Sequence, residues 1–88
     1  MVTKTIVVQN RAGVHARPAA MLVQEIKNFT SNIHFERGKD CINAKSIMGI
    51  ITLGAVYGTE IKIIVEGDDE QAALNALVHL FESKFEEE

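Results

Sequence analysis

Polar and apolar residues alternate along residues 32–37 and again along residues 60–66. A period of two is typical of a strand that buries one of its faces. Residues 2–8 are rich in β-branched side chains and predict an earlier strand. Residues 38–40 form a turn signal, after which residues 41–43 fit a short returning strand. The pattern therefore predicts four strands.

Apolar residues recur at intervals of three and four in two further segments, which predicts two amphipathic helices. The first helix includes Pro18 in its opening turn, where the missing N–H of proline costs nothing. Ahead of the last helix, Asp68 and Gln71 have the spacing of a capping box. Ser46 has the chemistry of an N-cap for a short helix over residues 47–53. The two stripes comprise Ala19, Leu22, Val23, Ile26 and Phe29, and then Leu74, Leu77, Leu80 and Phe81.

The predicted elements follow one another in the order β-α-β-β-α-β-α, without internal repeats or linkers. One antiparallel sheet with helices on one face is the simplest way to bury both helical stripes. The chain has 88 residues, of which 47% are hydrophobic, enough for a core. We therefore expect a single α+β domain over residues 1–88.

Composition narrows the classes of function. The net charge of −3 makes the chain a poor candidate for nucleic-acid binding, which depends on neutralising phosphates with Lys and Arg. The single Cys41 cannot form an intramolecular disulfide, and the three histidines lack the clustering of a metal site. A small domain that needs no disulfide fits a reducing compartment, so we expect a cytoplasmic protein. The first residues lack a signal-peptide pattern, and no apolar run has membrane-spanning length, so we expect no membrane insertion. We expect the acidic residues 86–88 to form a solvated tail.

His15 is the first candidate for chemistry. It lies in the segment Gly-Val-His-Ala-Arg-Pro-Ala-Ala (residues 13–20), at the start of the first predicted helix. Unpaired N–H groups and the dipole at a helix start attract anions, and Arg17 adds a permanent positive charge. These residues fit a histidine that carries a phosphoryl group, but a solvated polar histidine is the alternative. His34 and His79 are expected to be structural.

A second candidate site lies at residues 43–49, Asn-Ala-Lys-Ser-Ile-Met-Gly. Ser46 is either a plain N-cap or also a phosphorylation site, because a phosphate at a helix start meets N–H groups and the helix dipole. The following apolar residues either pack into the core or face outward as a docking patch. They are Ile47, Met48 and Ile51.

Residues 13–19 and 43–49 resemble the active-site and regulatory-serine segments of the HPr family. These are the phosphocarrier proteins of the bacterial phosphoenolpyruvate:sugar phosphotransferase system. The separation of the two segments, the order of elements and the length also agree, so the resemblance covers essentially the whole chain. It implies an open-faced β-sandwich, in which three helices cover one face of a four-stranded antiparallel sheet.

The resemblance also implies a role for each matching residue. His15 would accept a phosphoryl group on Nδ1 from phosphorylated enzyme I and pass it to sugar-specific enzyme IIA domains. Ala16 and Arg17 would offer backbone N–H groups, and the Arg17 side chain would steady the phosphoryl oxygens. Such a protein is a covalent carrier in a transfer chain rather than a turnover enzyme, and it needs no cofactor or metal.

In the same family, Ser46 would be the target of HPr kinase/phosphorylase. The residues Ile47, Met48 and Ile51 would form the apolar docking surface for protein partners. A monomer is expected.

The chain departs from the family pattern at three positions. Ala12 and Val14 stand where many members have Thr and Leu, which is a conservative change. Gln24 replaces a basic residue often found on the docking face, which would weaken electrostatic steering to acidic partners.

Two other classes of function stay open. One is a regulatory module that signals mainly through Ser46, with little or no sugar transport; the presence of His15 argues against a paralogue that has lost its histidine. The other is a small domain that binds a metabolite or RNA. Acidic charge and the lack of an aromatic-rich strand pair count against RNA.

Overall fold

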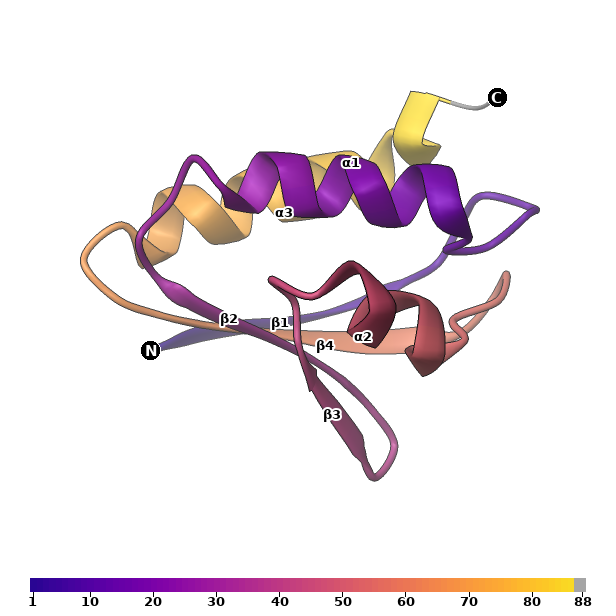
Figure 1. Cartoon of the computed structure of the whole chain (residues 1–88), viewed down its shortest axis with the longest axis horizontal. Helices are drawn as coiled ribbons and strands as arrows, with labels where there is room; N and C mark the ends of the chain where they lie inside the picture. The colour runs from indigo at the N-terminus through magenta and orange to yellow at the C-terminus, as the bar shows by residue number, and fades with distance from the viewer. Residues whose placement is uncertain (87–88) are drawn as a thin grey trace.

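The computed structural model describes residues 1–86 and has the predicted order of elements, followed by one short turn (Figure 1). The strand pattern of residues 32–37 and 60–66 is confirmed to the residue. The elements are β1 (Val2–Val7), α1 (Ala16–Ile26), β2 (Asn32–Arg37), β3 (Asp40–Asn43), α2 (Ile47–Leu53), β4 (Glu60–Glu66), α3 (Glu70–Glu82) and the turn η1 (Lys84–Glu86).

The four strands form one antiparallel sheet in the order β1-β4-β2-β3. The central strand β4 pairs with β1 on one side and with β2 on the other. Because side chains alternate between the faces of a strand, Ile61, Ile63 and Val65 all point into the core, opposite Ile6 and Phe35 on the neighbouring strands.

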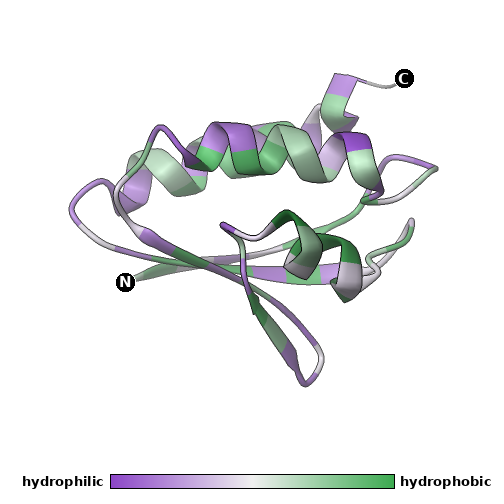
Figure 2. Ribbon diagram, in the orientation of Figure 1, coloured by the Kyte–Doolittle hydropathy of each residue, from purple (hydrophilic) through white to green (hydrophobic). Residues whose placement is uncertain are grey.

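The helices cover one face of the sheet, with α1 and α3 side by side and α2 next to β3 (Figure 1). Figure 2 shows apolar residues along the side of α1 that faces the sheet and polar residues on its outer side. Pro18, Ala19, Leu22 and Ile26 are the buried residues of this helix. The structure is therefore the expected open-faced sandwich. None of the helices within residues 1–86 has the length and apolar character needed to cross a bilayer.

The start of α3 differs from the prediction, because Asp68 and Gln71 do not form a capping box. Asp69 is the N-cap residue, and its carboxylate reaches a different loop. It accepts hydrogen bonds from the backbone N–H groups of Thr30 (2.8 Å) and Ser31 (3.0 Å) and from the Ser31 hydroxyl. The Ser31 hydroxyl and the Thr30 N–H hold the pKa of the Asp69 carboxyl below its usual value.

Residues 84–86 form one further turn after α3. The turn η1 follows α3 directly, and Phe85 within it is fully buried. Glu86 is exposed, as expected, whereas residues 87 and 88 of the predicted tail lie outside the described residues.

Candidate functional site

His15 is the N-cap residue of α1, at the end of the loop that leads from β1. Its backbone is extended (φ −96°, ψ −162°), and its carbonyl accepts the first helical hydrogen bond, from Ala19 N–H at 2.9 Å. Its side chain makes no capping hydrogen bond, and the residue is exposed. The imidazole therefore lies at the helix start but does not cap the helix.

The loop that presents His15 is fixed from two sides. Asn10 is buried, and its Nδ2 donates to the carbonyl of Gly13 at 2.7 Å. Val14 N–H donates to the carbonyl of Ala55 at 2.8 Å. Gly13 adopts a left-handed φ of +75°, and a Cβ there would lie only 2.8 Å from the Ala55 oxygen. This position requires glycine, both for its backbone angle and for the close approach.

The amino end of α1 has the features of an anion site. Ala16 and Arg17 lie in the first turn, where an α-helix has no acceptor of its own for backbone N–H groups. The helix dipole adds partial positive charge at this end. Pro18 is the third helical residue, and its ring is buried, which agrees with its predicted place in the first turn.

The Arg17 side chain lies along the outside of this first turn. Its Nη1 is 4.0 Å from the sulfur of Met21, and its Nη2 donates to the carbonyl of Phe85 at 3.5 Å. Sequence reasoning missed Phe85, because 68 residues separate it from Arg17 and no local pattern marks the contact.

Ser46 is the N-cap of α2, as predicted. Its hydroxyl oxygen accepts a hydrogen bond from the N–H of Gly49 at 3.0 Å, and the residue is exposed. The hydroxyl is therefore both a cap and reachable from solvent.

The apolar residues after Ser46 face outward, so their packing into the core is the alternative that the structure rules out. Ile47, Met48 and Ile51 are 39%, 65% and 37% exposed, whereas Ile50 and Leu53 bury the other face of α2. We call these three residues the α2 patch. Val56 and Tyr57, in the loop after α2, are also exposed, which the sequence pattern did not indicate.

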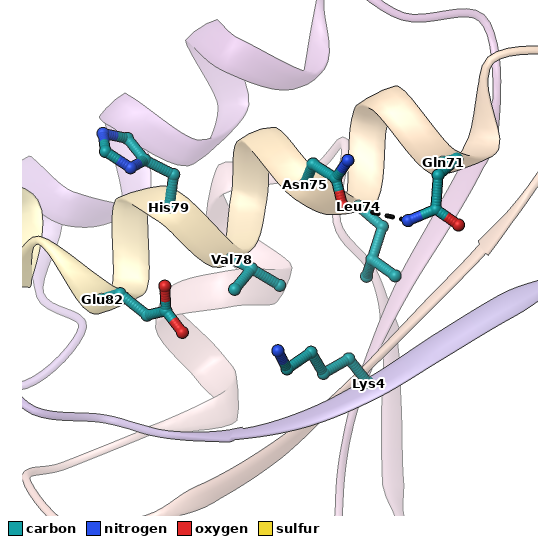
Figure 3. A pocket seen from close by; sticks show the side chains of 7 residues that line it. All are labelled: Lys4, Gln71, Leu74, Asn75, Val78, His79 and Glu82. Atoms are coloured by element: carbon teal, nitrogen blue, oxygen red, sulfur yellow. Dashed lines mark hydrogen bonds between the residues drawn. The ribbon is translucent and has the colours of Figure 1, made fainter.

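The other two histidines lie on separate elements. His34 is half-buried on β2, opposite Asn43. His79 is exposed on α3, at the edge of a pocket of about 420 Å³ between α3 and β1. In Figure 3, Lys4 extends toward this space, whereas the His79 ring projects to the other side of the helix. Within residues 1–86, no three His, Cys, Asp or Glu side chains form a group that could hold a metal ion.

Comparison with known sequences points to one family. The family model described as "PTS HPr component phosphorylation site" matches residues 2–83. The chain is 54% identical to the phosphocarrier protein HPr of Treponema pallidum, and the match covers all of both chains. It is also 45% identical to the HPr-like protein Crh of Halalkalibacterium halodurans, over 96% of this chain and 100% of that protein.

Solved structures agree with the sequence match. The crystal structure of HPr-C-His from Thermoanaerobacter tengcongensis superposes with a TM-score of 0.96 at 51% identity, covering 100% of this chain and 99% of the other. The HPr dimer from the same organism matches with a TM-score of 0.77 at 50% identity, over 97% and 98% of the two chains. With its sequence and its fold both matched over nearly their full length, the chain belongs to the HPr family of phosphocarrier proteins of the phosphotransferase system.

Proposed function

We propose that His15 is the residue that carries the phosphoryl group, accepting it from phosphorylated enzyme I and passing it to enzyme IIA domains. The observation that carries this proposal is the place of His15: an exposed imidazole at the amino end of a helix, without a capping role. A carrier needs such a place, because two partners must reach the same nitrogen in turn.

Phosphoryl uptake and phosphoryl release are each a displacement at phosphorus. The Nδ1 lone pair of His15 forms a bond to phosphorus while the bond between phosphorus and the donor breaks, and the electron pair of that bond stays with the donor. In the second step the acceptor attacks the same phosphorus, and the bond to Nδ1 breaks. The carrier returns unchanged, so it acts as a covalent intermediate of the transfer.

Positive groups at the end of α1 stabilise the transferred group. The backbone N–H groups of Ala16 and Arg17 and the helix dipole favour its negative charge. The Arg17 guanidinium steadies the phosphoryl oxygens. Further stabilisation of the transition state comes from partner residues at each interface.

The α2 patch is the proposed docking surface for these partners. Large exposed apolar groups on one short helix are typical of a protein interface, and Met suits a surface that must fit several partners. We place the carrier in the cytoplasm and expect it to be a monomer, although dimers occur among the solved relatives. Sedimentation at several protein concentrations tests the oligomeric state.

A second candidate function is regulation through Ser46, with HPr kinase/phosphorylase as the partner that modifies it. The exposed hydroxyl at the start of α2 favours this role, and so does the 45% identity to the HPr-like protein Crh. Regulation through Ser46 is compatible with transfer through His15, and in this second candidate function it is the main role of the chain.

Incubation with phosphoenolpyruvate and enzyme I, followed by intact mass measurement, separates the two functions. A carrier gains the mass of one phosphoryl group and loses it again when an enzyme IIA domain is added. A chain that gains no mass from enzyme I, but does so from HPr kinase/phosphorylase and ATP, acts through Ser46 alone.

A further inference from the structure

The guanidinium of Arg17 is in contact with the end of the chain. Its Nη2 donates to the carbonyl of Phe85 at 3.5 Å, and Figure 1 shows the turn η1 beside the amino-terminal half of α1. The functional arginine and the last described turn therefore meet at the helix end that carries His15.

Phe85 is held in place by its ring. The residue is fully buried, and the ring packs edge-on against that of Phe81, with 5.1 Å between centroids. The turn is closed by a hydrogen bond from Glu86 N–H to the carbonyl of Ser83 at 2.9 Å. The ring thus anchors a turn whose other residues are more accessible.

The backbone of this turn is strained. Lys84, Phe85 and Glu86 have φ angles of +56°, +55° and +62°, the left-handed region that side chains disfavour. None of the three is glycine, so tertiary contacts must hold the conformation. The burial of the Phe85 ring is such a contact, and one result of the conformation is that the Phe85 carbonyl meets Arg17.

We propose that Phe85 is a positioning residue for Arg17. Its buried ring fixes the left-handed turn, and the carbonyl of the turn holds the guanidinium beside the amino end of α1. The inference rests on the proposed function, because it assigns Phe85 a part in the transfer through His15. Phe85 does not touch the phosphoryl group and acts only through Arg17.

The test compares Phe85→Gly with Phe35→Leu in the full chain. Glycine accepts the left-handed backbone but removes the ring, whereas Phe35 is another buried ring packed edge-on against Phe81, at 6.0 Å. The readouts are the Arg17 Nε–H NMR resonance and the single-turnover rate of transfer from phosphorylated enzyme I. In Phe85→Gly we expect the resonance to move toward that of a solvated arginine. The rate at saturating donor should fall about two- to tenfold, which corresponds to the net value of one typical intramolecular hydrogen bond. The half-saturating donor concentration should be unchanged.

Phe35→Leu should leave the resonance and the rate unchanged although it lowers stability. In an Arg17→Ala background, Phe85→Gly should have no further effect on the rate. An unchanged Arg17 resonance in Phe85→Gly, or an equal change in Phe35→Leu, overturns the inference. If Phe85→Gly does not fold, Phe85→Leu is measured by the same two readouts, and a smaller change in each is expected.

If the wild type takes up no phosphoryl group from enzyme I, the proposed function fails. The Arg17 resonance still decides in that case whether Phe85 positions Arg17.

Discussion

His15 and Arg17 are two residues apart, yet their side chains have different surroundings. His15 is an exposed N-cap, while Arg17 extends along the first turn of α1 to Met21 and Phe85. An exposed arginine that is not part of the core contributes little to the free energy of unfolding. In the proposed function, its charge acts on the phosphoryl group that is transferred next to the start of the helix.

Replacement of Arg17 should therefore affect transfer far more than stability. Arg17→Ala is expected to slow transfer from enzyme I by about one to three orders of magnitude, or about 1.4–4 kcal/mol of transition-state stabilisation. The free energy of unfolding should change by only about 0.5 kcal/mol. Lys39→Ala is the control, because it removes a positive charge at the exposed turn between β2 and β3. Stopped-flow transfer rates and urea unfolding measure the two effects. A variant that unfolds readily but transfers at the normal rate contradicts the assignment.

Gly13 supports the site from within the loop. In Gly13→Ala, an alanine must adopt a left-handed φ, and its Cβ lies too close to the Ala55 carbonyl. Gly38→Ala is the control, because Gly38 also has a left-handed φ (+57°) but a Cβ there meets no atom within 4 Å. The control should lose about 1–2 kcal/mol of unfolding free energy from the backbone angle alone. Gly13→Ala should lose about 1–3 kcal/mol more, because backbone atoms must shift. Urea unfolding of both variants compares them, and equal losses would show that the close approach to Ala55 carries no cost.

The helix α2 begins at a capping serine and presents an exposed apolar surface directly after it. The Ser46 hydroxyl accepts from Gly49 N–H, and the next residues form the α2 patch. A phosphate on Ser46 adds about −1.5 to −2 charges at neutral pH. The charge is favourable for the helix end but must be desolvated when a partner docks beside it.

A negative charge at Ser46 should therefore weaken docking without unfolding the domain. Ser46→Asp is expected to raise the Michaelis constant of the transfer reaction with enzyme I. Ser46→Asn should leave this Michaelis constant unchanged, because asparagine has the shape of aspartate and can cap the helix but carries no charge. Ser46→Ala should lose about 0.5–2 kcal/mol of stability with the cap but keep the Michaelis constant. Titrations against enzyme I at low and moderate salt compare the four proteins. If all four have the same transfer kinetics, Ser46 is only a cap for α2.

Two loops at the other end of the helices are joined through Asp69. Its carboxylate accepts hydrogen bonds from Thr30 and Ser31, and these lower its pKa from the ordinary value of 3.8. A carboxyl whose pKa is lowered by folding stabilises the folded state above the unfolded pKa. This contribution is lost as the pH falls below 3.8 and through the folded pKa. The wild type should therefore become less stable on acidification over this range.

Asp69→Asn tests this contribution. The variant should be less stable than the wild type at pH 7, and the difference should shrink as the pH falls from 5 to about 2.5, as the linkage relation requires. Asp68→Asn, at the neighbouring exposed position, is the control. Urea unfolding at each pH gives the free energies. A difference between wild type and Asp69→Asn that stays constant with pH contradicts the assigned role of the carboxylate.

At the scale of the whole molecule, the local patterns predicted the elements but not their long-range contacts. The strands β2 and β4 were found to the residue because alternation is a local signal. The strand order β1-β4-β2-β3 was not predicted, since alternation does not specify which strands pair; the family resemblance implied only a four-stranded antiparallel sheet. The capping box at Asp68 was wrong, because Asp69 makes its hydrogen bonds to a loop 39 residues earlier in the chain.

In the candidate site, too, local patterns indicated some residues and left the long-range contacts unpredicted. His15, Arg17 and Ser46 became candidates from two short segments, because a helix start and a cap leave a sequence signature. The outward direction of Ile47, Met48 and Ile51 stayed open, because an apolar helix has no polar face to fix its orientation. Phe85 could not be found, because its contact with Arg17 depends on how the end of α3 meets α1.

In the proposed function, His15 is the one residue that accepts the phosphoryl group from enzyme I. Wild type, His15→Ala and the control His79→Ala are incubated with phosphoenolpyruvate and enzyme I, and the modified residue is located by mass spectrometry of fragments prepared at alkaline pH. The wild type and His79→Ala should carry one acid-labile phosphoryl group on His15, and His15→Ala should carry none while unfolding at the same urea concentration as the wild type. A His15→Ala protein that still accepts a phosphoryl group, on His34, His79 or any other residue, would show that His15 is not the acceptor.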